Sequence, residues 1–407
     1  MVLLFLLPLI VLGQSICGTD EYNSKIQHRG PLYQLRNDSI DLTTQYTIPV
    51  VVHIIENDSD KAPIYIQNSD VYYIIECLNR DFNLENADTS ILTDTLKNMP
   101  GNMRITFQLA EIGPNGEAAI GITRTKTNVG SFYHYNNGIK FDSLGGKDAW
   151  DTEKYFNIWV GSLWPGLLGY SQFPGGQLET DGIVVQADIM RSNPKIYTKY
   201  NKGRVVAHEV GHSLSLRHPW GNGYGCSDNL VSDIPTQNGP NYNCPDTTWS
   251  LCHGDTTRDV VKHYMDYCGD SCMVMFTKGQ VYNARKSIQQ YRKKLVNTIK
   301  FPSTNIDQII TNKIIKIYPT IANRTITIEN PSLEKEIYIK IYSLSGILKK
   351  EEKIDTKKCE INIEELENGL YFIGLYQDGK KIITKHLIVG PSKLIIQNLD
   401  SDLLIIK

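Results

Sequence analysis

The chain has 407 residues, enough for two or three domains, and its 41% hydrophobic and 21% charged content is an ordinary globular balance. The formal net charge of -2 argues against nucleic acid or an anionic membrane as a partner, since both need concentrated positive charge. The first residues, MVLLFLLPLIVLG, are apolar but too short to cross a hydrocarbon core of ~30 Å. We therefore predict a signal peptide over residues 1–15 and no stable transmembrane segment.

Export would place the chain in an oxidising compartment, where clustered cysteines form disulfides. The chain has 8 cysteines, and four of them lie close together in the sequence: Cys226, Cys244, Cys252 and Cys272. Spacing alone allows three pairings of these four. Cys268 lies in the same segment and could alter the pairing, and Cys77 has no evident partner.

Residues 16–45 are polar and weakly patterned, which is more typical of a pro-segment than of a core. A domain over residues 46–300 follows, in which apolar and β-branched runs alternate with a helical pattern. Strands are predicted at 48–55, 103–112, 155–163 and 182–190, and a helix at 69–82 with Ser69 or Asp70 as its N-cap. This alternation indicates an α/β or α+β domain with a mixed sheet.

The pattern changes again near residue 300, where residues 301–313 resemble a linker. Six short alternating segments then predict an all-β sandwich over residues 314–391, leaving 392–407 as a tail. The six predicted strands are 314–319, 324–330, 336–344, 359–366, 369–377 and 381–389. A carbohydrate-binding sandwich is one alternative for this region.

The stretch HEVGHSLSLRHPWG, residues 208–221, fits the zinc signature H-E-x-x-H-x-x-G-x-x-H except that Ser215 replaces the glycine. On a helix His208 and His212 are ~40° and ~6 Å apart, so both imidazoles can bind one ion from the same face. Glu209, beside the first of them, is placed to take a proton from an attacking water. The alternative is three histidines that bind no metal.

His218 can reach the same ion only if the chain turns back after His212. In a continued helix it would lie ~15 Å beyond His208 and ~80° off the binding face. Ser215 must therefore adopt the left-handed conformation, at a cost of ~1–2 kcal/mol for a residue with a Cβ. That cost is small beside the ~10–16 kcal/mol of structural zinc sites, so we expect Ser215 to reshape the turn without abolishing the site.

Over residues 46–295 the chain resembles the pappalysin branch of the metzincins, which includes the cytophagalysins. Besides the histidine motif, the likeness rests on the segments IPVVVHII, GITRTKT, GGKDAWDTEKYFNIWV, GLLGYSQFPGG, TDGIVV, CSDNLVSDIPTQNGPNYNCP and HYMDYCGDSCMVMFTKGQ, in that order. The resemblance implies an α+β metzincin catalytic domain, with a twisted mixed sheet, an active-site helix and an irregular lower subdomain. It also implies a secreted zinc endopeptidase that acts on proteins or peptides.

The resemblance assigns zinc to His208, His212 and His218, and general acid/base work to Glu209. Met265 in HYMDY is similar to the Met-turn methionine beneath the metal. Tyr267 is similar to the tyrosine near the zinc, whose hydroxyl can donate to a developing oxyanion. Plain packing in the core is the alternative for Met265, and a buried tyrosine with a backbone partner is the alternative for Tyr267.

The family pattern pairs Cys226 with Cys252 and Cys244 with Cys272. Asp228 and Asp233 lie in the loop where relatives bind calcium, so the resemblance suggests a structural Ca²⁺, with a solvated turn as the alternative. Asp270, five residues after Met265, could favour a basic residue after the cleaved bond.

CGTDE, which begins at Cys17, resembles a pro-segment in which a cysteine occupies the open position of the zinc. This implies a latent precursor, and an unused or disulfide-bonded Cys17 is the alternative.

The β-rich region after residue 314 resembles the C-terminal sorting domain of the type IX secretion system, through YP followed by ANRTITI, IYSLSG and ENGLYFIGL. The last residues, GPSKLIIQNLDSDLLIIK, continue past the expected end of such a domain. The resemblance implies the type IX machinery as a partner and a secreted or cell-surface location.

A rival function is a cell-surface adhesin or binding protein with a structural or inactive zinc site. Glu209 argues against it, because a binding module has no need for a carboxylate beside three histidines.

Overall fold

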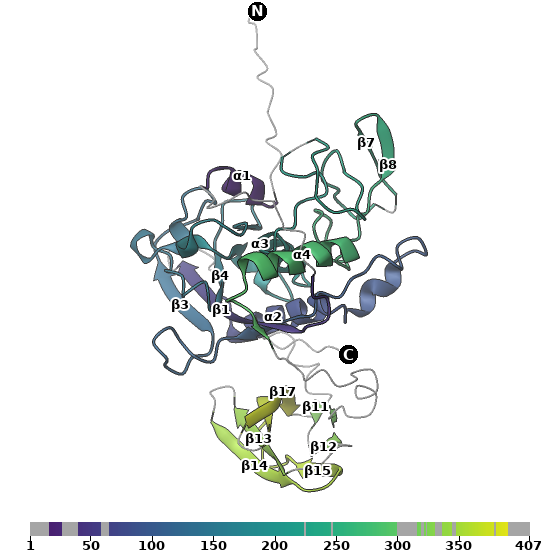
Figure 1. Ribbon diagram of the computed structural model, residues 1–407. Coiled ribbons are helices and arrows are strands. Elements are labelled where there is room, and N and C mark those ends of the chain that lie inside the picture. The colour runs from purple at the N-terminus through teal and green to yellow at the C-terminus, as the bar shows by residue number, and fades with distance from the viewer. Residues whose placement is uncertain are drawn as a thin grey trace, which may run out of the picture. The chain divides into compact units, whose positions relative to one another are not determined.

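The computed structural model describes residues 16–26, 40–57, 65–223, 225–245, 247–298, 316–318, 321–322, 324–329, 336–343, 347–377 and 380–389. These residues form two compact units that divide between residues 300 and 301 (Figure 1). The predicted signal peptide, the linker 301–313 and the tail 392–407 lie outside the described residues. None of the described helices is long and apolar enough to span a membrane.

The first unit is built on a mixed sheet, as predicted. Its described residues form seven strands in the order β2-β1-β4-β6-β5, with β3 and β9 also paired to β1. The strands are β1 (Tyr46–Asn57), β2 (Ile105–Leu109), β3 (Ile122–Thr127), β4 (Phe156–Gly161), β5 (Gly169–Ser171), β6 (Ile183–Gln186) and β9 (Asn297–Thr298). Pairing is parallel except where β5 meets β6 and β9 meets β1. The antiparallel β5 lies at the end of this order and therefore offers an edge.

Helices cover this sheet and a separate hairpin extends from the unit (Figure 1). The α-helices are α1 (Thr19–Ser24), α2 (Asn68–Phe82), α3 (Arg204–Ser213) and α4 (Lys278–Tyr291), and the hairpin is β7 (Trp249–Cys252) with β8 (Asp255–Arg258). Short 3₁₀ turns are η1 (Ala87–Ile91), η2 (Gly138–Lys140), η3 (Asp142–Leu144), η4 (Leu178–Thr180) and η5 (Ala187–Met190). Helices α2 and α3 pack on each other and on the sheet, so the main core lies between them and the strands.

Helix α2 begins earlier than the sequence predicts. Its N-cap is Gln67, and Asp70 is the third helical residue, whose carboxylate accepts the Gln67 N–H at 2.8 Å. The prediction of Ser69 or Asp70 as N-cap is therefore wrong, because Asp70 acts from inside the first turn as the second half of a capping box. The predicted strand 182–190 also ends at Gln186, where the chain enters η5.

The second unit is all-β, as predicted. Its described strands form one three-stranded sheet, β10-β12-β15, and one five-stranded sheet, β11-β17-β16-β13-β14. The strands are β10 (Lys316–Tyr318), β11 (Ile321–Ala322), β12 (Thr325–Glu329), β13 (Ile337–Ser343), β14 (Leu348–Ile354), β15 (Lys358–Asn362), β16 (Gly369–Gln377) and β17 (Lys380–Val389). Buried residues from both sheets form a single cluster, as a small sandwich requires.

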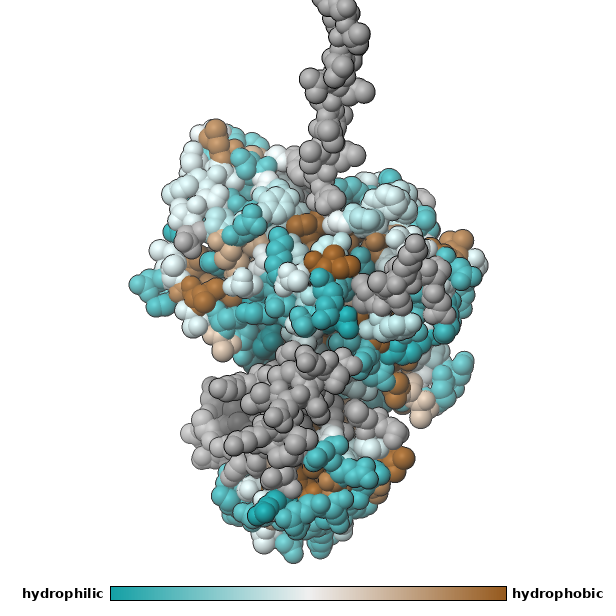
Figure 2. Space-filling view, turned by 180° about the vertical axis from the view of Figure 1, so that it is seen from behind, coloured by the Kyte–Doolittle hydropathy of each residue, from teal (hydrophilic) through white to brown (hydrophobic). Residues whose placement is uncertain are grey.

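The surface of the described residues is mostly hydrophilic on the face that Figure 2 shows, and apolar residues form small separate patches on it. Scattered patches of this kind are ordinary on protein surfaces.

Candidate active site

The first two histidines of the motif and Glu209 lie on α3, all of whose residues are buried. The helix begins after Gly203, which has a left-handed φ of +75°, and its first residue, Arg204, is held by several groups. The Arg204 guanidinium donates to the Asp270 carbonyl at 2.7 Å and to the Asp88 carboxylate at 2.9 Å. The Asp270 carboxylate in turn accepts the Arg204 N–H at 3.3 Å. These bonds fix the start of the helix and give Asp270 a structural role, while the predicted preference for basic residues stays a prediction.

The end of α3 is a Schellman motif with Ser215 in the position usually held by glycine. Ser215 has a φ of +69°. Its N–H donates to the His212 carbonyl at 2.9 Å, and the Leu216 N–H donates to the Gly211 carbonyl at 3.0 Å. The chain therefore leaves the helix and turns back, as the spacing of the motif requires for His218.

The turn brings the three histidines together. Their Nε2 atoms lie 3.0 Å apart for His208 and His212, 3.1 Å for His212 and His218, and 3.3 Å for His208 and His218. The Nδ1 atoms lie 2.7 Å from the Tyr264 carbonyl for His208, 2.7 Å from the Leu216 carbonyl for His212, and 2.9 Å from the Asp20 carboxylate for His218. With the ring proton held on Nδ1, each Nε2 lone pair points to one shared position. Burial also lowers the pKa of His208 and His212 well below the usual value, so both are neutral near pH 7.

The thiol of Cys17 completes this group. The sulfur and the three Nε2 atoms lie within 4.8 Å of one another, the only such set of histidine, cysteine or acidic ligands found among the described residues. Three imidazoles and a thiol are ligands that zinc accepts, and four is its preferred number. The donor set therefore fits a zinc ion.

Glu209 lies directly beside this group and is fully buried. Its Oε2 atom accepts from the hydroxyl of Thr19 at 3.1 Å and lies 3.6 Å from the Cys17 sulfur. Burial raises the pKa of the Glu209 carboxyl to about 8. Strand β5 passes so close that a Cβ on Gly169 would lie 2.8 Å from the Glu209 Cγ, so only glycine fits there.

Met265 and Tyr267 flank the histidines from the chain that follows the β7–β8 hairpin. Met265 is fully buried, and its sulfur would lie 2.5 Å from a Cβ on Gly211, so it packs directly under α3. The Tyr267 ring centroid lies 5.1 Å from that of His218, and its hydroxyl donates to the Cys17 carbonyl at 3.3 Å. The structure thus places both residues at the histidines, where Met265 packs under the helix and the Tyr267 hydroxyl bonds to the N-terminal segment.

A small cavity of about 10 Å³ remains between the N-terminal segment and the protein body, enough for roughly one water molecule. It is lined by Ile16, Cys17, Tyr200, Val205, His208, Glu209, Asp266, Tyr267, Cys268 and Met273. Ile16 and Cys17 belong to the N-terminal segment, so the body side of this cavity would widen if that segment left.

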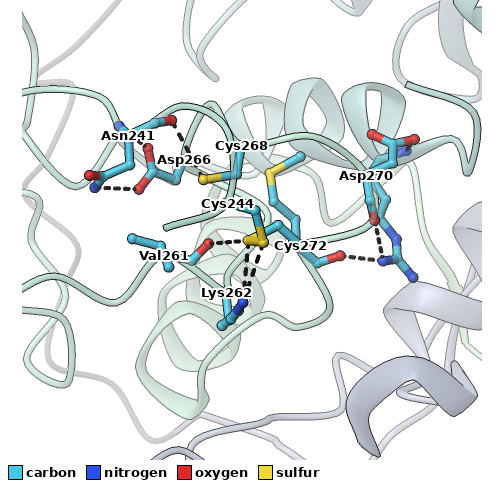
Figure 3. The surroundings of a disulfide bond; sticks show 10 residues. Asn241, Cys244, Val261, Lys262, Asp266, Cys268, Asp270 and Cys272 are labelled. Atoms are coloured by element: carbon cyan, nitrogen blue, oxygen red, sulfur yellow. Dashed lines mark hydrogen bonds between the residues drawn. A yellow bond between two sulfur atoms is a disulfide. The ribbon is translucent and has the colours of Figure 1, made fainter. Parts of the chain in front are cut away.

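Two disulfides join the four clustered cysteines, Cys226 to Cys252 and Cys244 to Cys272, which is the pairing that the resemblance implies. Figure 3 shows the second, with the Lys262 ammonium near both sulfurs, at 3.4 and 3.5 Å. Cys268 is a buried free thiol that donates to the Asn241 carbonyl at 3.6 Å. Cys77 is a buried free thiol as well.

The two candidate calcium ligands, Asp228 and Asp233, accept hydrogen bonds from other groups of the protein. Asp233 accepts from the Thr277 hydroxyl and from the Gly279 N–H, both at 2.8 Å, at the start of α4. Asp228 accepts the Leu230 N–H at 2.7 Å. A calcium site at this loop therefore remains a prediction without support from the geometry.

Sequence reasoning missed several residues that shape the site. Thr19 and Asp20 reach Glu209 and His218 across more than 180 positions of sequence, and such pairs leave no local signal. The Tyr264 carbonyl that orients His208 is a backbone group, which any residue type could supply. Gly169 belongs to the segment GLLGYSQFPGG, but the sequence does not show why it must be glycine. The reason is that a Cβ there would collide with Glu209, which packs against β5.

Comparison with known proteins decides the family. Residues 141–289 match the M43 peptidase family described as pregnancy-associated plasma protein-A. A solved promirolysin mutant from Tannerella forsythia is 38% identical, covers 62% of this chain and 84% of its own, and superposes with a TM-score of 0.58. Mature mirolysin in complex with a cleaved peptide is 38% identical, with coverage of 63% and 99% and a TM-score of 0.57. The chain belongs to the M43 peptidase family, the pappalysins.

Curated fungal relatives of this M43 chain are named extracellular metalloproteases. That of Arthroderma otae is 29% identical over 214 residues, 50% of this chain and 76% of the fungal protein. That of Arthroderma benhamiae is 33% identical over 158 residues, 37% of this chain and 58% of the fungal protein. This chain thus spans from just over half to three quarters of their length.

The second unit has its own match. Residues 316–390 match the secretion system C-terminal sorting domain. The chain is therefore a metalloendopeptidase with a metzincin-like fold, followed by a small all-β domain of the type IX sorting class, and it is secreted or held at the cell surface.

Proposed function

We propose that this M43 peptidase is a zinc endopeptidase made as a latent precursor. In this proposal His208, His212 and His218 hold the zinc, Glu209 is the general base, and Cys17 blocks the site before activation. The observation that carries it is the convergence of three buried Nε2 atoms and the Cys17 sulfur within 4.8 Å, directly beside Glu209.

A zinc ion bound there would supply a Lewis acid that makes a water more acidic and polarises a peptide carbonyl. Glu209 accepts the proton of the attacking water and returns it to the leaving amine, because its carboxylate is adjacent to the ligands. Its position supports this role, since the Glu209 carboxylate lies 3.6 Å from the Cys17 sulfur, the group that would give way to the attacking water.

Tyr267 supplies a hydrogen-bond donor for the oxyanion that forms on the attacked carbonyl. In the present structure its hydroxyl donates to a backbone carbonyl, that of Cys17, at 3.3 Å. A donor already directed at a carbonyl oxygen needs little reorganisation when charge develops there.

The N-terminal segment, residues 16–26, supports latency because it covers each of these groups. Cys17 forms a parallel bridge with Gly169, and the Gly18 N–H donates to the Gly169 carbonyl at 2.9 Å. The segment thereby occupies the free edge of β5, where an extended substrate peptide would otherwise pair. The segment also covers the proposed base, through the hydrogen bond of Thr19 to Glu209, and one proposed ligand, through the contact of Asp20 with His218.

Protein or peptide substrates follow from the family and from the occupied edge of β5. The solved complex of mirolysin with a cleaved peptide supports peptides as ligands of this fold. The sorting domain supports the type IX secretion machinery as a transport partner.

The test uses the full chain, activated by limited proteolysis, with casein as substrate. We expect one zinc per chain, and loss of cleavage on addition of a chelator with recovery on zinc. Glu209→Gln should reduce kcat at least 1,000-fold while zinc content stays the same, since the substitution removes the base and keeps the ligands. The exposed Glu179 provides the matched control, Glu179→Gln, which should behave like the parent chain.

Two results would separate this proposal from its rival. Zinc-dependent catalysis would be excluded if the untreated parent chain, the chelator-treated chain and the Glu209→Gln chain all cleaved casein equally well. Tightly bound zinc with no cleavage of any protein by the activated chain would favour the adhesin or binding protein instead.

A further inference from the structure

Tyr22, five residues after Cys17 on α1, fills a deep pocket in the body of the first unit. The side chain is 2% exposed. Its hydroxyl donates to the Asn137 side-chain oxygen at 2.7 Å and accepts from the Lys140 ammonium at 3.0 Å. Its ring packs on Tyr170, with centroids 4.9 Å apart. The phenol is thus recognised at its ring and at its hydroxyl.

Apart from Tyr22, the walls of this pocket belong to elements that do not depend on the N-terminal segment. Trp159 comes from β4, Tyr170 from β5, Val184 from β6, and Lys140 from η2. Three of these elements are strands of the central sheet, so the walls keep their place when Tyr22 leaves. The pocket is therefore a preformed site and not a cavity made by the segment itself.

Lys140 lies at the floor of the pocket and is fully buried. Its ammonium donates to the Thr180 carbonyl at 2.7 Å and faces the rings of Tyr22, Trp159 and Tyr170. No carboxylate lies within ion-pair distance of it in the described part of the chain. Burying a cation without a directly paired carboxylate is costly, and burial lowers the Lys140 pKa to about 7 although the charge of Asp181 acts in the opposite direction. A phenol oxygen and aromatic faces are the groups that compensate such a cation.

The pocket lies beside the proposed substrate edge. Asn23, next to Tyr22, donates to the Ser171 carbonyl at 2.8 Å and accepts the Phe173 N–H at 2.8 Å, at the end of β5. Tyr170, a pocket wall, is the middle residue of that strand, and its own hydroxyl is buried without a partner in the described structure. A peptide that pairs with β5 would pass the mouth of the pocket.

We propose that this pocket, floored by Lys140, is a side-chain subsite for tyrosine that Tyr22 fills in the precursor and a tyrosine of a peptide substrate fills after activation. The proposal rests on the proposed function, because only a released N-terminal segment leaves the pocket open.

The first test measures binding without catalysis. Fluorescent peptides of residues 16–26, all carrying Cys17→Ser to remove the thiol, are titrated against the activated Glu209→Gln chain and followed by anisotropy. We expect Tyr22→Phe to weaken binding about tenfold through loss of the hydrogen bonds to Asn137 and from Lys140, and Tyr22→Ala about 100-fold or more. Ser24→Ala is the matched control, because Ser24 is exposed and bonds only within the segment, to the Glu21 carbonyl. It should bind like the parent peptide.

Lys140→Met provides the reciprocal test, in which the preference for the tyrosine peptide over the phenylalanine peptide should fall, leaving only the part that the Asn137 bond supplies. If this variant fails to fold, the peptide series on the Lys140 chain still decides. Equal binding of the tyrosine and phenylalanine peptides to that chain, or no binding of the parent peptide, would overturn the proposal. Because this readout needs no cleavage, its failure is distinct from failure of the proposed peptidase function.

The second test measures selectivity in the activated chain with Glu209 intact. Peptide mixtures carry tyrosine, phenylalanine or alanine at one position at a time. We expect one position at which kcat/KM for tyrosine exceeds that for phenylalanine about tenfold, and Lys140→Met should reduce this ratio, because only the Asn137 bond to the hydroxyl remains. A chain that cleaves the mixtures with no preference for tyrosine over phenylalanine at any position would refute the subsite.

Discussion

Ser215 takes the backbone conformation that the histidine motif requires, with a φ of +69°, although it carries a Cβ. The spacing of the motif predicts this turn, because His218 cannot otherwise approach His212. What the spacing does not predict is a second interaction, in which the Ser215 hydroxyl lies 2.8 Å from the Ser287 hydroxyl of α4. Both side chains are buried, so the serine ties the end of α3 to α4.

Ser215 affects the free energy of unfolding in two opposing ways, through its strained backbone and through its bond to Ser287, and a double-mutant cycle can separate them. Ser215→Gly relieves a left-handed strain of ~1–2 kcal/mol but leaves the Ser287 hydroxyl unpaired, which costs ~1–3 kcal/mol. We therefore expect the single variant to change the free energy of unfolding by less than about 1 kcal/mol. Ser287→Ala should destabilise by ~1 kcal/mol, and the double variant should be more stable than Ser287→Ala by ~1 kcal/mol. Urea unfolding of the precursor measures all three, and a double variant no more stable than Ser287→Ala would show that the turn is unstrained.

Element by element, the described part of the N-terminal segment contributes to the site through its polar side chains. The weak hydrophobic pattern of residues 16–45 predicts a pro-segment, and the structure packs residues 16–26 against β5 and the histidines. Thr19, Asp20 and Asn23 each bond to a group of the body. Helix α1 is therefore held at several points, of which Cys17 is only one.

Latency should accordingly depend on more than the thiol. We expect Cys17→Ala to give the uncleaved precursor only part of the activity of the proteolytically activated chain, because the bonds of Thr19 and Asp20 remain. The double variant Cys17→Ala with Asp20→Ala should give the uncleaved precursor clearly higher activity than Cys17→Ala alone, since the second substitution removes the bond to His218. Cleavage of a quenched peptide by intact precursor measures this, with the exposed Glu21→Ala added to Cys17→Ala as the matched control. If both Cys17 variants stay as inactive as the parent precursor, the cysteine does not maintain latency.

The sequence predicts elements where side-chain pattern and burial agree. The run IPVVVHII gave the central strand β1, which is buried along most of its length. Strand β14, LKKEEKI, was not predicted, because most of its residues are charged and its place at the edge of a sheet leaves them in water. Helix α4 was not predicted either, since its few apolar residues, such as Val281 and Ile288, give a weak helical pattern. Helix α4 is stabilised by groups distant in sequence, such as Asp233 at its start, whereas β14 depends on its pairing with the preceding strand β13.

The same limit applies to the site. Residue types and spacing on one helix predict that His208 and His212 share a face, with Glu209 beside the first of them, because that geometry is local. The contacts of Asp20 with His218 and of Tyr22 with Lys140 join residues 198 and 118 positions apart. No local rule relates such pairs, so only the folded chain brings them together.

On the scale of the whole molecule, the chain consists of two units with separate cores. In the described residues, each cluster of buried apolar side chains belongs entirely to one unit or to the other. Strand β9 closes the first unit by pairing with the beginning of β1. Both disulfides lie in the first unit, whereas the only cysteine of the second, Cys359, is a free thiol.

This division predicts how the full chain melts. Because the cores are separate, calorimetry of the full chain should show two transitions. A reductant should lower only the transition of the first unit, since each disulfide there contributes ~2–4 kcal/mol by restricting the unfolded chain. Cys244→Ala with Cys272→Ala should reproduce part of this shift without reductant, and Cys359→Ala, the matched control, should leave the first transition where it was. A single transition that reductant lowers as a whole would mean that the two units unfold together, and would contradict independent cores.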